Sequence, residues 1–135
     1  MTGTLIDSNV LLDIITSDPR WLNWSEARLE ECASEESIFI NPIIYAEVSI
    51  NFATIEEMET AVPVSGFKRL QIPPEAAFLA GKVFLKYRKA GGVRTTTLPD
   101  FFVGAHAAVS GLKLLTRDAR RFRTYFPTVK LIAPE

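Results

Sequence analysis

Cysteine and histidine are almost missing from this chain of 135 residues, which contains one of each. A lone cysteine, Cys32, excludes an intramolecular disulfide and a cysteine-rich zinc site, and it favours the reducing cytoplasm as the location. No base is placed to activate the Cys32 thiol as a nucleophile. The single histidine, His106, lies almost two helical turns beyond Asp100 on a different face, so we do not expect it to be catalytic.

Long apolar runs are also missing. No segment approaches the roughly 20 apolar residues that cross a membrane, so no membrane partner is predicted. The first ten residues, "MTGTLIDSNV", lack a basic region and a cleavage site, and we expect no signal peptide. An apolar content of 47% in a chain of this length instead predicts one globular domain over residues 1–135.

The net charge of −1 conceals an uneven distribution of charge along the chain. Residues 1–66 contain twelve acidic and two basic residues, whereas residues 67–135 contain four acidic and thirteen basic residues. A basic half favours contact with a polyanion or with an acidic partner. The alternative is that folding brings the two halves together and averages their charges.

Short apolar segments alternate with helical patterns, which predicts an α/β fold with a mostly parallel central sheet. Strands are predicted at Thr4–Asp7, Ser37–Ile40, Lys113–Thr116 and Val129–Ile132, and Phe67–Ile72 is either a strand or a linker. Helices are predicted at Asn9–Ile15, Trp21–Ala33, from Pro42 onward, Ile55–Ala61, Pro74–Lys89 and Asp100–Ser110. A short basic helix or turn follows Asp118.

Two acids follow predicted strands. Asp7 ends the first strand, and Asp118 comes directly after "LLT" at the end of another. In parallel α/β sheets the carboxyl ends of the strands line the ligand-binding crevice, so both side chains are candidates for a functional site. Each has a structural alternative, because an aspartate there can cap the helix or turn that follows.

Two further acids lie near the starts of predicted helices. Glu47 shares a helical face with the apolar residues Ile44 and Val48, and a buried carboxylate costs several kcal/mol unless it is paired or metal-bound. Asp100 heads a helix whose inner face carries small residues such as Gly104, which lets that helix lie close to a sheet. A rotation that exposes Glu47 and a capping role for Asp100 are the alternatives.

The four acids make a pattern that none makes alone. If the sheet is parallel, all four side chains can meet at one edge, where their charges repel one another. A hard divalent cation such as Mg²⁺ or Mn²⁺ relieves this repulsion and prefers oxygen ligands. One such ion, or a pair, can activate water and stabilise the oxygens of a phosphodiester under attack. The sequence therefore predicts a metal-dependent phosphodiesterase.

Four blocks of sequence resemble the PIN-domain ribonucleases, and in particular the VapC toxins of bacterial toxin–antitoxin pairs. They are "LIDSNVLLDI", "NPIIYAEV", "LPDFFVGAHA" and "LLTRDARRF", in that order along nearly the whole chain. The resemblance implies a three-layer α/β/α PIN-like fold. It also implies a Mg²⁺-dependent endoribonuclease that is the toxin of a type II, VapBC-type pair and hydrolyses RNA with metal-activated water.

The same resemblance assigns roles to individual residues. Asp7 and Asp100 match the most constant metal ligands, Glu47 matches the second acid, and Asp118 matches the acid that supports a second metal. Asn9 and Thr116 match polar positions that form hydrogen bonds to the carboxylates. The partners implied are an RNA substrate, a VapB-like antitoxin and a second copy in a homodimer. Apolar residues around Trp21, Leu22 and Trp24 are candidates for protein contacts or for core packing.

Basic residues surround the last of the four acids. Arg117, Arg120, Arg121 and, more weakly, Arg94 are candidates for contact with RNA or an antitoxin, since guanidinium groups bind phosphates by forked hydrogen bonds. The alternative is a solvated turn, or pairing with Asp118. We interpret Asp13 as a surface residue. No RNA-binding signature with interleaved aromatic residues is found.

Other functions fit less well. A phosphatase of the haloacid dehalogenase type needs a second aspartate two residues after the first, where this chain has Asn9. A receiver domain needs adjacent acids near the end of the first strand. A catalytically inactive PIN-like module that binds RNA or protein remains the main alternative. The sequence leaves open which RNA is cut.

Overall fold

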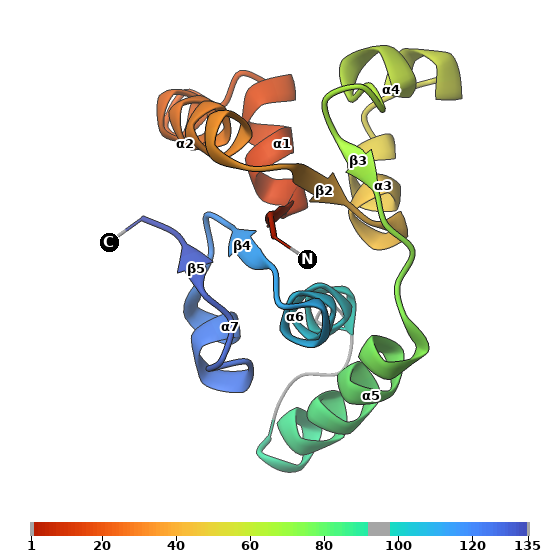
Figure 1. The fold of residues 1–135 in the computed structure, drawn as a ribbon, viewed down its shortest axis with the longest axis vertical. Coiled ribbons are helices and arrows are strands. Elements are labelled where there is room, and N and C mark those ends of the chain that lie inside the picture. The colour runs from red at the N-terminus through yellow and green to blue at the C-terminus, as the bar shows by residue number, and fades with distance from the viewer. Residues whose placement is uncertain (1, 92–97, 135) are drawn as a thin grey trace.

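A five-stranded parallel sheet lies at the centre of the computed structural model, which describes residues 2–91 and 98–134 (Figure 1). The spatial order is β3-β2-β1-β4-β5, and every neighbouring pair is parallel. The predicted α/β class is thus confirmed. The strands are β1 (Thr4–Ile6), β2 (Ile38–Ile40), β3 (Lys68–Arg69), β4 (Lys113–Leu115) and β5 (Leu131–Ile132).

Helices cover both faces of this sheet. In Figure 1, α1 and α2 lie on one side of the central strands, and α6 and α7 lie on the other. Helix α1 also packs against α3, and α6 packs along α5. The helices in the described ranges are α1 (Ser8–Ile15), α2 (Leu22–Glu35), α3 (Pro42–Ser49), α4 (Ile55–Ala61), α5 (Pro74–Lys89), α6 (Leu98–Ser110) and α7 (Arg120–Tyr125).

Local sequence explains where several helices begin and end. The Asn41 side chain accepts a hydrogen bond from the Ile44 amide at 2.9 Å, and Pro42 occupies the first turn of α3. Helix α6 is followed by Gly111, whose φ of 65° is one that glycine adopts without strain. These are signals that the sequence alone displays.

Several predicted boundaries differ from those of the structure, and two of them bear on the site or on the sheet. Helix α6 begins at Leu98, two residues earlier than expected, because proline is tolerated in the first helical turn. Asp100 therefore lies inside the first turn and does not cap the helix. Only Lys68–Arg69 of the segment 67–72 is a strand, paired with β2 at the edge of the sheet.

An aromatic cluster holds the α5–α6–α7 side of the molecule together. Phe101 on α6 is fully buried, and its ring centroid lies 5.3 Å from that of Tyr87 on α5 and 5.4 Å from that of Tyr125 on α7. Gly104, one turn further along α6, lies directly against the Phe126 ring. Because Gly104 has no side chain, α6 can lie close to Phe126, the C-cap residue of α7.

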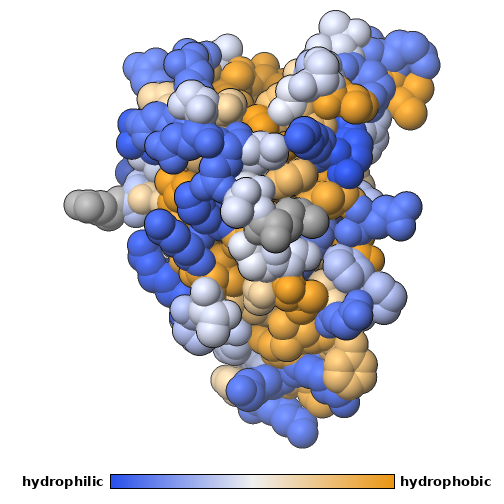
Figure 2. Space-filling model, viewed as in Figure 1, coloured by the Kyte–Doolittle hydropathy of each residue, from blue (hydrophilic) through white to orange (hydrophobic). Residues whose placement is uncertain are grey.

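The surface mixes polar and apolar residues. Figure 2 shows hydrophilic residues over the side of α7 and β5, with apolar residues emerging over α5 and α6. The α5 side chains Phe78 and Leu85 are 69% and 45% exposed. None of the helices in the described ranges has both the length and the hydropathy needed to cross a bilayer.

Candidate active site

The strand order creates a topological switch point at the carboxyl ends of the two central strands, and we use the name crevice for the region there around Asp7, Glu47, Asp100 and Asp118. From β1 the chain continues through α1 and α2 to β2 on one side, while β4 pairs with β1 on the other side. Ligands in parallel α/β folds bind where such connections diverge. Asp7 follows β1 there and Thr116 follows β4, and the Thr116 hydroxyl donates a 2.8 Å hydrogen bond to Asp7 Oδ2.

Asp7 is buried at the floor of this crevice, with 4% of its surface exposed. Its Oδ1 accepts a 2.8 Å hydrogen bond from the Ser8 amide, so it caps α1, and Asn9 Nδ2 lies 3.4 Å from Oδ2. Burial, together with the carboxylates of Asp100 and Glu47, raises the pKa of Asp7 from 3.8 to about 7, against the hydrogen bonds from Thr116 and Ser8. Asp7 thus caps α1 and also contributes a buried carboxyl group with a raised pKa to the crevice.

Glu47 reaches the crevice from α3. Its Oε1 accepts a 2.9 Å hydrogen bond from the Ser8 hydroxyl, and the side chain is half-buried. Burial raises its pKa, and the charge of Asp100 acts in the same direction. Ser8 therefore connects two of the acids, through its amide to Asp7 and through its hydroxyl to Glu47. Ser8 was not among the site residues predicted from the sequence, although it directly follows Asp7.

Asp100 enters from the first turn of α6, with a third of its side chain exposed. Burial raises its pKa, Asp118 adds to that effect, and the guanidinium of Arg121 opposes it from 2.6 Å. Asp118 is more exposed than the other three acids, and its amide donates to Thr116 Oγ1 at 3.1 Å. The negative charge of Asp118 raises the pKa of Asp100.

Four acids from distant parts of the chain thus lie at one edge of the sheet. Their charges raise one another's pKa values. Asp100 and Glu47 raise the pKa of Asp7, Asp100 raises that of Glu47, and Asp118 raises that of Asp100. They surround the crevice without converging: within residues 2–91 and 98–134, no three Asp, Glu, His or Cys side chains form a group that could hold a metal ion.

The chemistry of the donor set nevertheless fits a hard divalent cation. All four groups are carboxylates, and the raised pKa values of three of them show that their negative charge is incompletely compensated. Mg²⁺ and Mn²⁺ bind oxygen donors and often retain water ligands, so a few carboxylates suffice.

Asp13 and Arg117 form a second network behind the crevice. Arg117 donates to both Asp13 oxygens at 2.9 and 3.0 Å, and Ser25 Oγ donates to Asp13 at 2.7 Å. Asp13 is 2% exposed, so its interpretation as a surface residue was wrong: a guanidinium from another part of the chain compensates its charge. The Arg117 amide also donates to Asn9 Oδ1 at 3.1 Å. Arg117 therefore holds the crevice residues in place.

The other sequence candidates are spread around these networks. Arg121 bonds Asp100, Arg120 is exposed on α7, and Arg94 lies outside the described residues. His106 is buried, its Nδ1 lies 3.0 Å from Asn41 Nδ2, and burial lowers its pKa. A neutral His106 that accepts from Asn41 connects α6 to the end of β2.

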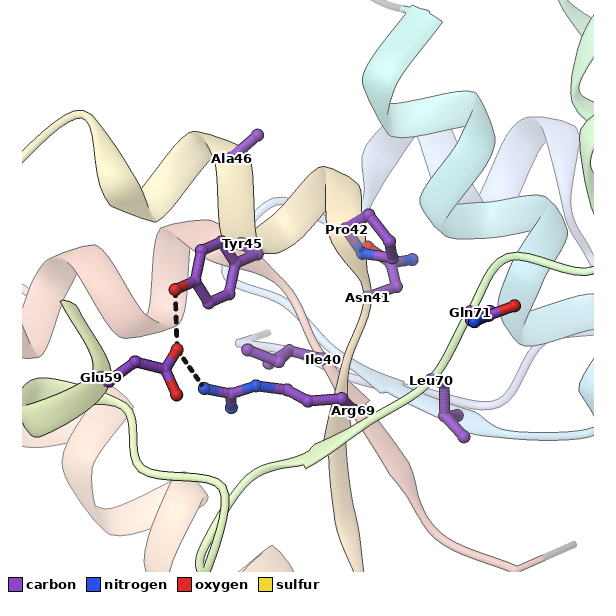
Figure 3. A pocket seen from close by; sticks show the side chains of 9 residues that line it. All are labelled: Ile40, Asn41, Pro42, Tyr45, Ala46, Glu59, Arg69, Leu70 and Gln71. Carbon is purple, nitrogen blue, oxygen red and sulfur yellow. Dashed lines mark hydrogen bonds and ion pairs between the residues drawn. The ribbon is translucent and has the colours of Figure 1, made fainter. Parts of the chain in front are cut away.

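An apolar cavity of about 480 Å³ lies on the β3 side of the sheet, and none of the four acids lines it (Figure 3). At one end the Tyr45 hydroxyl donates to Glu59 at 2.6 Å, and Arg69 donates to the same oxygen at 3.0 Å. Arg69 also donates to the Val62 carbonyl at 2.7 Å. These polar groups satisfy one another and join α3, α4 and β3, so we assign them to the fold.

The comparison with known families identifies the class of protein. The chain matches the PIN domain family over residues 4–126. It therefore belongs to the PIN domain family, and the predicted three-layer α/β/α fold is confirmed. No protein with a curated description matches the chain.

Solved structures of toxin–antitoxin complexes are similar over almost the full length. VapBC2 from Rickettsia felis, bound to a promoter DNA fragment, has a TM-score of 0.75 at 18% identity, with 100% of each chain covered. DNA-bound VapBC from Salmonella typhimurium has a TM-score of 0.71 at 20% identity, with 98% of each covered. A toxin–antitoxin complex from Klebsiella pneumoniae gives 0.71 at 21%, again over 98% of each. At these identities the similarity establishes the fold.

Proposed function

We propose that this PIN domain is a Mg²⁺- or Mn²⁺-dependent endoribonuclease and the VapC-type toxin of a type II toxin–antitoxin pair. The observation that carries the proposal is the burial of Asp7, 4% exposed, at the same edge of the sheet as Glu47, Asp100 and Asp118, where burial and the neighbouring carboxylates raise its pKa. A binding-only protein gains nothing from this repulsive arrangement, whereas a metal-dependent nuclease needs it. The four intact acids and the similarity to VapBC complexes support the same conclusion.

In this proposal each side chain has a definite task. Asp7 and Asp100 would hold the metal, with Glu47 and Asp118 binding directly or through water; the bound ion would supply an activated water and charge stabilisation. Thr116, Ser8 and Asn9 fix the orientation of Asp7 and Glu47 by hydrogen bonds. Arg121, already 2.6 Å from Asp100, is placed to meet a phosphate that approaches the crevice.

Two protein partners belong to the proposal: a VapB-like antitoxin and a second copy of the chain. The similar structures are toxin–antitoxin complexes. Exposed apolar side chains such as Phe78 and Ile50 offer surface for such contacts. A small DNA-binding protein encoded beside this chain would support a cytoplasmic toxin–antitoxin pair.

Cleavage of RNA tests the catalytic part. The wild type should cut RNA with Mg²⁺ or Mn²⁺ and stop when EDTA is added. Asp100→Asn and Glu47→Gln should each lower the cleavage rate by at least about a hundredfold, because a lost ligand or orienting group weakens both metal binding and activity. Glu30→Gln, which removes an exposed charge on α2, is the matched control and should retain full activity.

Two outcomes would contradict this proposal. Cleavage that persists in EDTA, or full activity in Asp100→Asn, would exclude the metal-dependent mechanism. RNA binding with no cleavage under any divalent ion would favour the catalytically inactive PIN-like module.

A further inference from the structure

A second cavity, of about 610 Å³, opens beside the acidic crevice. Its lining comes from the end of α5, the segment before α7, and α7 itself: Tyr87, Asp118, Arg120, Arg121, Thr124 and Tyr125. Two of these residues also belong to the crevice, since Arg121 bonds Asp100 and the charge of Asp118 reaches Asp100. A molecule in this cavity therefore lies next to the proposed scissile phosphate.

The cavity combines positive charge with aromatic rings. Arg121 lies 5.7 Å from the centroid of the Tyr87 ring, so one guanidinium contacts an acid and a ring at once. The Arg120 side chain is exposed and forms no ion pair or hydrogen bond with residues 2–91 and 98–134. Guanidinium groups in this arrangement suit phosphate.

The rings are held rigidly by the core. Tyr87 and Tyr125 meet edge to face, with centroids 5.6 Å apart and an interplanar angle of 81°, and both contact the buried Phe101. Both tyrosines are only half-buried, which leaves part of each ring toward the cavity. A rigid, partly exposed ring beside a guanidinium is how proteins stack and hold an unpaired base.

We propose that this cavity binds one unpaired nucleotide of the RNA beside the cleavage site, with its base against Tyr125 and its phosphate at Arg120. This inference rests on the proposed function and assigns the residues that hold the nucleotide next to the scissile phosphate. A base in a duplex has both faces covered by its neighbours in the stack, so it reaches the tyrosine ring only after unpairing. The cavity could not be predicted from the sequence, because its two tyrosine rings lie on different helices, 38 positions apart along the chain.

The binding of RNA, measured in EDTA so that no cleavage takes place, tests the inference. Fluorescence anisotropy would compare a labelled single-stranded RNA with the same strand in a perfect duplex, using the full chain. The single strand should bind about tenfold more tightly. Arg120→Ala should weaken its binding and make the slope of log K against log salt shallower by about 0.7, the value for one phosphate contact. Lys68→Ala, which removes a charge on β3 at the other edge of the sheet, should change neither property.

Two pairs of variants distinguish loss of binding in the cavity from a change in overall charge and from loss of folding. Tyr125→Leu should weaken single-strand binding about tenfold, and Tyr125→Phe should restore it because the stacking face is kept. Thr124 is exposed, so its variants leave the core intact. Thr124→Glu should weaken binding by placing negative charge in the cavity, whereas Thr124→Gln, of nearly equal size, should not.

Failure of this inference differs from failure of the nuclease proposal. Unchanged binding in Thr124→Glu and Arg120→Ala, or equal affinity for single strand and duplex, overturns the subsite even if the protein cuts RNA. In an active protein the same variants should raise KM and leave kcat nearly unchanged. The expected binding pattern in a protein that never cuts RNA would support the subsite and refute the nuclease.

Discussion

At the scale of single residues, Asp7 combines hydrogen bonds that favour its charged form with a buried position that disfavours it. It caps α1 and accepts from Thr116, yet it is buried beside two other carboxylates. Between its ordinary pKa of 3.8 and its folded value of about 7, the unfolded chain releases the proton while the folded protein keeps it. The titration of Asp7 by itself therefore lowers the free energy of unfolding of the metal-free wild type as the pH rises from 4 to 7, by on the order of 4 kcal/mol.

Asp7→Asn removes this charge and keeps an oxygen that can accept from the Ser8 amide. We expect the variant to be more stable than the wild type in EDTA at pH 8, with the difference shrinking toward pH 4.5, where Asp7 is protonated in the folded protein. Urea denaturation at both pH values measures this. Asp18→Asn is the matched control: backbone amides of Trp21 and Arg20 lower the pKa of Asp18, so that variant should show no gain at pH 8. An equal difference for Asp7→Asn at both pH values would contradict the argument.

At the scale of elements, α6 brings Asp100 to the crevice because its inner face is small. A methyl group at Gly104 would overlap the buried Phe126 ring. Gly104→Ala should therefore lower the free energy of unfolding by about 1–3 kcal/mol despite the better helix propensity of alanine. Gly81→Ala is the control, because nothing lies within 4 Å of the added methyl on α5. That variant should be neutral or stabilised by up to about 1 kcal/mol, as chemical denaturation can show. Equal effects at the two glycines would refute the packing argument.

Element boundaries show which features a sequence can predict. Asn41-Pro42 marked the start of α3 because capping acts within four residues. The burial of Asp13 was missed because it depends on Arg117, 104 positions away. Ser8 was missed for the same reason, because its hydroxyl can bond Glu47 at 2.9 Å only after folding brings α3 beside α1. The positions of Asp7, Asp118 and Asp100 could be predicted because strand ends and a helix start place them, and Glu47 could be predicted from its helical face, whereas the hydrogen-bond partners of these acids arise from tertiary contacts.

At the scale of the whole molecule, the acidic and basic halves of the chain are partly paired. Asp13 with Arg117, Glu36 with Lys113 and Glu59 with Arg69 all join one half to the other. The expectation that folding averages the charges of the two halves is therefore confirmed in part, and contact of the basic half with a polyanion stays a prediction. The acids of the crevice are not paired in this way. Among the ion pairs of residues 2–91 and 98–134, the one that involves these acids joins Arg121 to Asp100, and both residues belong to the basic half.

A divalent ion in the crevice would connect β1, α3, α6 and the segment before α7, so its binding should stabilise the whole fold. At a Mg²⁺ concentration a hundredfold above the dissociation constant, the gain is about 2.7 kcal/mol, visible as a rise in Tm at pH 8 relative to EDTA. Asp100→Asn should lose most of this rise, and Glu30→Gln should keep it. Na⁺ at matched ionic strength controls for screening of the acids. A Mg²⁺-dependent rise of equal size in wild type and Asp100→Asn would place the ion elsewhere, because only a ligand in the crevice makes the rise depend on Asp100.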